Sequence, residues 1–243
     1  MARFVLIHGA LHGAWCWESV IPLLERLGHE VVAPDLPGMG ADTAPLAEVT
    51  LEQWSECIID IARSGVGQAI LVGHSRGGIV ISDAAERAPN AVAGLVYVSA
   101  MLLPDNESMM GFAAKHMPHL GDSTIVCDDG ISTRFDPSRA EQIFYNRTDP
   151  QIAAAAIDKL TPEPVAPNVT PLTLTKERFG RIRRAYIECS EDNAVPLPAQ
   201  RLMQESLVCD PVVTLDSDHS PFLSCPAALA ASLNEIARKW DVP

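Results

Sequence analysis

The sequence has no excess of basic residues, and this excludes one large class of partners. Its 243 residues include 18 Lys and Arg against 31 Asp and Glu, which gives a formal net charge of −13, and the basic residues form no cluster. A protein that binds nucleic acid or an anionic membrane surface needs a positive patch that follows the phosphates. We therefore expect no nucleic acid and no membrane among its partners.

Closely spaced cysteines and long apolar runs are absent too. The six cysteines form no C-x-x-C pair and no metal-like spacing with histidine, so we expect buried free thiols in a reducing compartment and no metal site. No uncharged apolar run approaches the roughly 20 residues of a transmembrane helix. His8-Gly9 breaks the apolar start of the chain before it reaches the length of a signal peptide, which predicts a cytoplasmic protein. The cysteines are Cys16, Cys57, Cys127, Cys189, Cys209 and Cys225.

Short apolar runs instead alternate with segments of helical periodicity along most of the chain. With 243 residues the chain can form one domain with a sizeable core. Such alternation is typical of a parallel sheet with helices on both faces, so the sequence predicts an α/β fold. The strands at 4–7 and 30–33 are both expected to be buried. The other expected strands are the run from 69, 92–99, 185–189 and 211–215, and the expected helices are 15–27, 51–64, 79–87, 198–207 and 226–240.

The start of the helix at 51–64 carries a specific signal. Thr50 is a favourable N-cap residue, and Gln53 stands three residues later, where its side chain can complete a capping box. The pattern therefore predicts a helix that begins at residue 51. Its expected apolar face comprises Leu51, Trp54, Ile58 and Ile61.

Residues 104–180 do not follow the strand and helix alternation. This segment has prolines, methionines, aromatic residues and short helical runs such as 150–160, but no apolar run of the quality seen elsewhere. Sheet-like segments resume after it, which favours an insertion over a separate domain. The sequence therefore predicts a single domain, 1–243, with an inserted helical cap at about 104–180.

One apolar run ends in a turn that carries a reactive side chain. The run from Ala69 leads into Gly73-x-Ser75-x-Gly77-Gly78, and a helical segment follows. A strand that turns this sharply into a helix places the serine at the apex with φ above zero, which requires small flanking residues. The turn exposes the serine hydroxyl and directs the first amides of the helix toward it. The motif predicts Ser75 as a nucleophile.

Two polar residues at strand ends complete the expected catalytic group. A serine nucleophile needs a base and a carboxylate that orients the base, and such groups collect at the carboxyl ends of parallel strands. Asp192 follows the strand expected at 185–189, and His219 follows the last strand, so we expect Asp192 as the acid and His219 as the base. The alternative acids are Glu191, Asp216 and Asp218, and the histidines expected to be structural are His8, His12, His29, His74, His116 and His119.

The loop after the first strand, residues 8–13, is expected to complete an oxyanion hole. A hydrolase of this type binds the oxyanion with one amide from this loop and one from the residue after the nucleophile. The predicted donors are therefore the backbone amides of Ala10 and Arg76. Gly9 and Gly13 would keep the loop close to the sheet, although a simple turn would also account for them.

Together these motifs resemble the α/β-hydrolases, in the branch that holds plant methylesterases, plant hydroxynitrile lyases and bacterial pyrethroid-type carboxylesterases. The resemblance covers nearly the whole chain and rests on residues 4–10, 12–17, 73–75 and 191–192. It implies an α/β-hydrolase fold. It also implies the triad Ser75, Asp192 and His219, with oxyanion roles for the amides of Ala10 and Arg76.

Three positions bear on the activity within this branch. The lyases carry threonine where Gly9 stands and lysine where Ser220 stands, so the resemblance implies an esterase. The esterases usually have leucine, methionine or tyrosine after the serine, and Arg76 departs from this pattern. Its charge either lies near the substrate or points away along the helix, in which case only its amide matters.

The sequence thus predicts a cofactor-independent serine carboxylesterase that acts on small to medium hydrophobic or aryl esters. A hydroxynitrile lyase, a carbon–carbon hydrolase or lactonase with the same triad, and a non-catalytic ligand receptor are the alternatives. The expected partner is a small-molecule ester, and a homodimer is left open. The residues expected to line the pocket are Leu11, Trp15, Leu102, Met109, Phe112 and Phe222.

Overall fold

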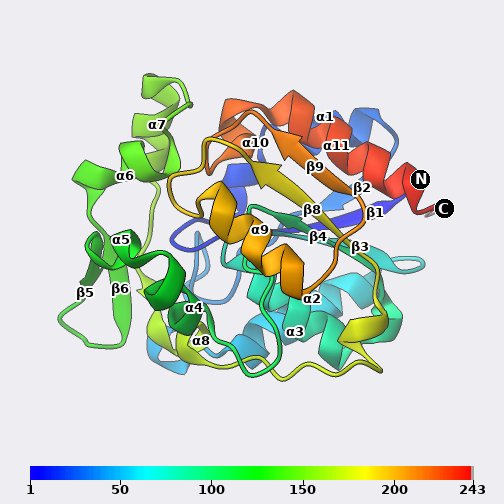
Figure 1. The fold of residues 1–243 in the computed structure, drawn as a ribbon, viewed down its shortest axis with the longest axis horizontal. Helices are drawn as coiled ribbons and strands as arrows, with labels where there is room; N and C mark the ends of the chain where they lie inside the picture. The colour runs from blue at the N-terminus through cyan, green and yellow to red at the C-terminus, as the bar shows by residue number, and fades with distance from the viewer. Residues whose placement is uncertain (242–243) are drawn as a thin grey trace.

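The centre of the molecule is a sheet of six parallel strands. The computed structural model describes residues 1–241, and its main sheet has the strand order β2-β1-β3-β4-β8-β9 (Figure 1). Every neighbouring pair in this sheet is parallel, so the carboxyl ends of the strands share one edge. The strands are β1 (Arg3–Ile7), β2 (Glu30–Val32), β3 (Ala69–His74), β4 (Val92–Val98), β8 (Arg184–Cys189) and β9 (Val212–Leu215).

Helices cover both faces of the sheet, as the alternating pattern predicts. On one face Leu24, Phe222 and Leu233 join one apolar cluster, and on the other Trp54 and Met203 join a second. In Figure 1, α1 and α11 lie above the sheet and α2 and α3 lie below it. The helices of the first face are α1 (Ile21–Arg26), α10 (Pro221–Ser224) and α11 (Pro226–Lys239), and those of the second are α2 (Leu51–Ser64), α3 (Gly77–Arg87) and α9 (Leu197–Ser206).

Two expectations for the first part of the chain are corrected. Strand β2 is not buried: Glu30 is exposed and the two valines are half-buried, because β2 pairs with β1 alone and forms an edge of the sheet. The helix expected at 15–27 is broken into a 3-10 turn, Ala14–Trp17, and the short helix α1. Pro22, in the first turn of α1, has no amide hydrogen to continue a helix from the preceding turn. Further 3-10 turns are Leu46–Glu48, Pro89–Ala91 and Phe179–Arg181.

The 104–180 segment, between β4 and β8, is not purely helical. It contains a second, three-stranded antiparallel sheet in the order β5-β6-β7, on the left in Figure 1. These strands are two to four residues long and lack a continuous buried run, so no sequence pattern indicates them. The elements are α4 (Met109–His116), α5 (Pro118–Gly121), β5 (Thr124–Val126), β6 (Ser132–Phe135), α6 (Pro137–Phe144), α7 (Pro150–Ile157), β7 (Glu163–Pro164) and α8 (Val165–Val169).

The cysteines are free, but only some are buried. Cys16, Cys189 and Cys209 are buried, whereas Cys57, Cys127 and Cys225 are half-buried. Burial raises the pKa of the Cys209 thiol to about 12. Within residues 1–241 no helix is long and apolar enough to cross a bilayer. The same residues contain no cluster of three or more His, Cys, Asp or Glu side chains arranged to hold a metal ion.

The capping box of α2 is present in the structure. Thr50 Oγ1 accepts a hydrogen bond from the Gln53 amide at 3.2 Å, and Gln53 Oε1 accepts one from the Thr50 amide at 2.9 Å.

We expect Thr50→Ala to lower the free energy of unfolding by about 1 kcal/mol, because the amide of Gln53 loses its acceptor. Equilibrium urea denaturation measures this change. Thr50→Ser keeps the hydroxyl and should match the parent protein; an equal loss in both variants would contradict the capping role.

Candidate active site

The turn between β3 and α3 has the strained backbone that the motif predicts. Ser75 has φ of 51°, in the left-handed region that side chains other than glycine rarely adopt. Such a conformation costs about 1–3 kcal/mol. Three backbone hydrogen bonds hold it in place: the Ser75 amide donates to Val98 O at 3.2 Å, and Ser75 O accepts from the amides of Gly78 at 3.0 Å and Met101 at 2.9 Å.

Close backbone contacts explain the glycines that follow Ser75. A Cβ on Gly77 would lie 2.8 Å from the carbonyl oxygen of Ile7, and one on Gly78 would lie 2.5 Å from that of Met101. Both distances are shorter than van der Waals contact with a backbone atom that has little freedom to move. The first turn of α3 therefore packs against β1 and the segment after β4 only because these positions lack side chains.

His219 and Asp192 meet at the carboxyl edge of the sheet. His219 Nδ1 lies 2.8 Å from Asp192 Oδ2, and both side chains are buried. Asp192 Oδ1 accepts hydrogen bonds from the amides of Ala194 at 2.7 Å and Val195 at 2.8 Å, while Ser99 Oγ donates to Oδ2. Because a carboxylate can only accept, the Nδ1 atom of His219 carries the hydrogen and Nε2 is left as the basic nitrogen.

His219 also lies against the residue that precedes Ser75. His74 Nε2 donates to His219 O at 2.7 Å, and the two imidazole ring centroids are 4.6 Å apart. Among the described residues no hydrogen bond joins Ser75 Oγ to His219 Nε2. Catalytic hydrogen bonds in ligand-free structures are commonly long or poorly aligned. The arrangement places a buried histidine–aspartate pair next to the elbow.

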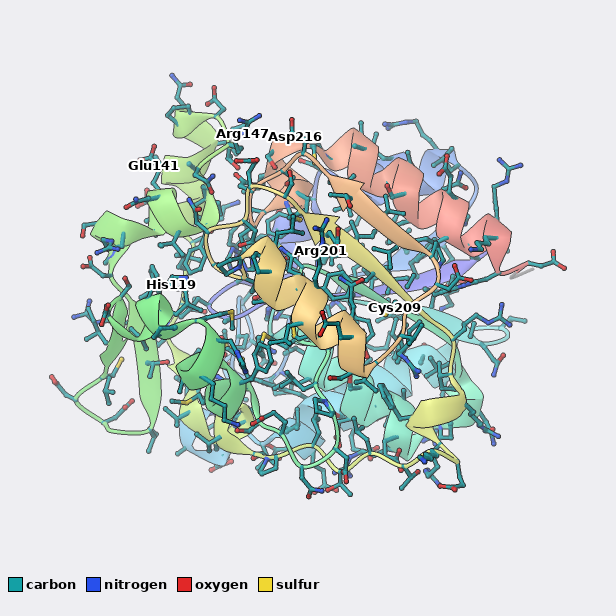
Figure 2. The ribbon with its side chains drawn as sticks, viewed as in Figure 1. His119, Glu141, Arg147, Arg201, Cys209 and Asp216 are labelled. Carbon is teal, nitrogen blue, oxygen red and sulfur yellow. The ribbon has the colours of Figure 1, made fainter. Side chains whose placement is uncertain are left out.

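The alternative carboxylates contact other groups. Asp218 Oδ1 accepts from the Ser220 amide at 3.0 Å, and its Oδ2 accepts from Thr148 Oγ1 at 2.8 Å. Asp216 is exposed and lies 3.6 Å from the Arg147 guanidinium, at the top of Figure 2. Asp218 thus joins the loop that carries His219 to the 104–180 segment, and Asp216 forms a surface ion pair.

Three other buried histidines surround the site, and all are held neutral. Burial lowers the pKa of His12 to about 4, and it lowers the pKa of His8 and His74 well below the usual value. His12 Nδ1 lies 2.7 Å from Ala10 O, so Nδ1 carries the hydrogen and Nε2 accepts from Tyr145 Oη at 2.8 Å. The three imidazole rings therefore place no positive charge near His219 at neutral pH.

The histidines outside this group lie away from the elbow and contact other groups. His29 lies 2.9 Å from Asn234 Oδ1, and His119, on α5 at the left of Figure 2, donates from Nε2 to Asn193 O at 2.9 Å. His116 is exposed at the end of α4 and lies against Phe112.

The loop after β1 packs directly on the elbow. A Cβ on Gly9 would lie 2.7 Å from His74 Nδ1 and 2.9 Å from Ser75 Cβ, so a side chain at this position would force the loop or the elbow to move. The backbone amides of Ala10 and Arg76 have no hydrogen-bond acceptor within residues 1–241. Both amides are therefore free to donate to a ligand.

The Arg76 side chain is buried and turns toward this loop. It is 0% exposed, its Nη2 donates to Gly9 O at 3.0 Å, and its Nε lies 3.4 Å from Glu163 Oε1. Burial lowers the pKa of Arg76, while the charge of Glu163 acts in the opposite direction. The side chain therefore does not point away along α3.

Three of the residues expected to line a pocket lie around the site. Leu11 follows Ala10 in the loop after β1, and the Trp15 ring stacks on His12 with centroids 5.2 Å apart. The Phe222 ring meets His74 edge to face at 4.9 Å. Leu11 and Trp15 pack with Phe144 in one apolar cluster, whereas Phe222 is fully buried and belongs to the apolar core on the α1 and α11 face.

The other three belong to the apolar core on the α2 and α3 face. Leu102 and Phe112 are buried in that cluster, and Met109 packs against it. Phe144, which is not among the residues predicted to line the pocket, has its ring centroid 5.8 Å from that of His219. It lies at the end of α6 in the 104–180 segment.

Two polar contributors to the site were also missed from the sequence. Ser99 directly follows β4, and its position at the carboxyl end of a strand was a usable signal. Glu163 gave none, because it stands in a two-residue strand with no motif around it. Its contact with Arg76 joins residues far apart in the chain and exists only in the folded molecule.

The sheet order, the elbow after β3 and the polar residues after β8 and β9 define an α/β-hydrolase fold. The chain belongs to the alpha/beta hydrolase family, whose model matches residues 4–232. This confirms the fold and the family that the sequence motifs predict.

The relatives include named esterases. The chain is 34% identical to methyl jasmonate esterase 1 of Vitis vinifera, over 98% of this chain and 98% of the relative. It is 34% identical to the pyrethroid hydrolase of Sphingobium wenxiniae, over 96% of this chain and 86% of the relative. The crystal structure of a pyrethroid hydrolase from Sphingobium faniae JZ-2 matches with a TM-score of 0.88 at 32% identity, covering 98% of this chain and 97% of that chain.

Acid should destabilise the protein because His12 is buried without charge. An unfolded histidine gains a proton near pH 6.5, whereas folded His12 does so only near pH 4. Between these values the unfolded state binds more protons, so the free energy of unfolding falls as the pH falls. His12→Gln removes this difference, and its stability should decline less between pH 6.5 and pH 4, by up to roughly 3 kcal/mol.

Urea denaturation at a series of pH values measures this slope. The matched control is His116→Gln, since His116 is exposed at the end of α4. The control should retain the parent slope. Identical slopes for His12→Gln and the parent would show that His12 does not stay neutral in the fold.

Proposed function

We propose that this protein is a serine carboxylesterase with Ser75, His219 and Asp192 as its catalytic triad. The observation that carries the proposal is the buried His219–Asp192 pair beside the strained serine elbow. The named esterases among the relatives support the same reaction class. No cofactor takes part in the proposed chemistry.

In the proposed reaction Ser75 Oγ attacks the ester carbonyl carbon while His219 Nε2 accepts the hydroxyl proton. The electron pair of the carbonyl moves to its oxygen, which the amides of Ala10 and Arg76 stabilise. The carbon–oxygen bond to the alcohol then breaks, and His219 returns its proton to the leaving alkoxide. A water molecule repeats the sequence on the acyl-enzyme and releases the acid. Asp192 keeps Nδ1 of the ring protonated throughout.

The substrates that suit the site are small to medium hydrophobic or aryl esters. The side chains around the elbow are mainly aromatic: Trp15 stacks on His12, Phe144 lies against His219, and the fully buried Phe222 packs against His74. The exposed Lys159 ammonium lies 5.2 Å from the centre of the Trp15 ring. The 104–180 segment supplies Phe144, which supports its role as a cap over the site. Two of the relatives are named methyl jasmonate esterase and pyrethroid hydrolase, and these names support an ester substrate.

A hydroxynitrile lyase fits the site less well. The position where the lyases carry lysine holds Ser220, which is buried and donates its amide to Asp218. The position where they carry threonine holds Gly9, where any Cβ meets His74 and Ser75 at less than 3.0 Å.

The cysteines bear on where the protein works. Free thiols are typical of a reducing compartment, and on this ground we propose the cytoplasm.

Replacing the nucleophile should abolish ester hydrolysis. We expect Ser75→Ala to lower kcat for 4-nitrophenyl esters by at least about 1,000-fold, since the acyl-enzyme cannot form. Initial rates with esters of increasing acyl length measure both the loss and the chain-length preference. Ser206→Ala changes an exposed serine and serves as the control. Hydrolysis that survives Ser75→Ala would refute the mechanism, and no hydrolysis by the parent would favour a receptor.

Asp192→Asn should fold and yet be nearly inactive. The amides of Ala194 and Val195 hold one oxygen of residue 192, so the new amide group would face His219. An amide that donates to Nδ1 moves the hydrogen to Nε2 and removes the base, with an expected loss of about 10,000-fold in kcat. Thermal unfolding monitored by circular dichroism checks the fold. A kcat within tenfold of the parent would show that Asp192 does not orient His219.

A further inference from the structure

The Gly9–Ala10 peptide group carries one of the two amides of the proposed oxyanion hole. Its carbonyl oxygen accepts two hydrogen bonds, from Arg76 Nη2 at 3.0 Å and from His8 Nδ1 at 2.9 Å. A peptide group is planar and normally trans, so its C=O and N–H point in opposite directions. Fixing the Gly9 oxygen therefore also fixes the direction of the Ala10 N–H.

The Arg76 guanidinium is well placed to hold this peptide. It is fully buried, and its central carbon lies 4.0 Å from the Trp54 ring centroid, within the range of a cation–π contact. A charged donor makes a stronger hydrogen bond than a neutral one, and in a buried site it polarises the peptide group that accepts it. The polarised peptide is the better donor at its N–H.

The charge that balances Arg76 comes from the 104–180 segment. Glu163, 2% exposed, lies 3.4 Å from Arg76 Nε and accepts from the amide of Leu11 at 2.6 Å. Leu11 has φ of 66°, and its carbonyl accepts from the Thr161 amide at 2.9 Å. Leu11 contacts Glu163 Oε2, and Asn168 Nδ2 donates at 2.6 Å to Oε1, the oxygen that faces Arg76. One carboxylate thus joins the oxyanion loop, the residue after the nucleophile and the 104–180 segment.

We propose that the Arg76 side chain is a positioning residue that aims the Ala10 amide at the oxyanion, and that Glu163 is the counterion that holds Arg76 there. Arg76 acts twice under this proposal: its own amide donates to the oxyanion, and its side chain orients the second donor. The proposal rests on the esterase function above. It assigns a role to a side chain that the triad chemistry leaves unused.

The test compares Arg76→Met, Glu163→Gln and the double variant in the hydrolysis of a 4-nitrophenyl ester. Arg76→Met should lower kcat by about 10-fold to 100-fold, less than the roughly 100-fold to 1,000-fold for complete loss of an oxyanion donor. KM should stay within about threefold of the parent, because the amide acts mainly on the transition state. Glu163→Gln keeps an acceptor for Leu11 and should show a smaller loss in kcat.

Inhibition by an aryl trifluoromethyl ketone provides a second readout. This compound forms a hemiketal with the nucleophilic serine, and the oxygen of the adduct carries the charge that the oxyanion hole binds. Its inhibition constant should rise by the same factor as kcat falls in each variant. If Arg76 only stabilised the fold, the change in the inhibition constant would not follow the change in kcat.

Arg3→Met is the matched control. Arg3 is also buried, with an ion pair to Glu30 at 2.7 Å and a hydrogen bond to the Ala62 carbonyl at 2.9 Å, but it does not contact the oxyanion loop. Its loss should lower stability and leave kcat unchanged. If Arg76→Met does not fold because Glu163 is left unpaired, the double variant removes both charges, and its kcat is compared with that of Glu163→Gln.

The outcomes separate this proposal from the esterase function. A folded Arg76→Met or double variant with parental kcat overturns the positioning role, provided that Ser75→Ala is inactive. An equal loss of kcat in Arg3→Met overturns it as well, since the effect would then follow stability alone. Activity that persists in Ser75→Ala instead refutes the esterase mechanism itself.

Discussion

A left-handed backbone at one serine is the constraint on which the rest of this structure depends. Ser75 has φ of 51°, and the bonds from its backbone to Val98, Gly78 and Met101 hold it between β3 and α3. The turn brings the amide of Arg76 and the side chain of Ser75 to the same edge of the sheet. The strands β8 and β9 end at that edge too, because all strands of the main sheet are parallel. The strained turn and the parallel strand order therefore bring Ser75, Asp192 and His219 to one edge of the sheet.

Polar groups at this edge are buried, and within residues 1–241 Arg76 Nε, Arg76 Nη1 and Ser220 Oγ have no hydrogen-bond partner. The Asp192 carboxylate, by contrast, is fully partnered. The Asp192 carboxylate accepts from two amides, from Ser99 and from His219, so a buried charge is satisfied without an arginine or lysine. The neighbouring histidines are kept neutral by burial, which leaves the His219–Asp192 pair free of nearby positive charge from them. The buried cation next to the elbow, Arg76, is balanced by Glu163 across the loop after β1.

Much of the fold was predictable because its signals are local. The capping box at Thr50, the apolar runs of β1, β3 and β4, and the glycines around Ser75 each depend on residues close together in the chain. Predictions failed where the position of a segment in the folded sheet, and not its own sequence, decides its structure. Strand β2 has an apolar pair typical of a buried strand but lies at the sheet edge, and the sheet of the 104–180 segment is built from strands too short to form a pattern.

The sequence by itself determined the α/β-hydrolase fold, the elbow at Ser75 and the strand ends that carry Asp192 and His219, because chain order and strand periodicity set these features. Only the tertiary structure decided which carboxylate meets His219, that Ser99 supports it, and that the Arg76 side chain turns to Gly9 and Glu163. The physical reason is distance along the chain. Contacts between residues dozens of positions apart leave no periodicity and no spacing, and they arise only when separate elements pack together.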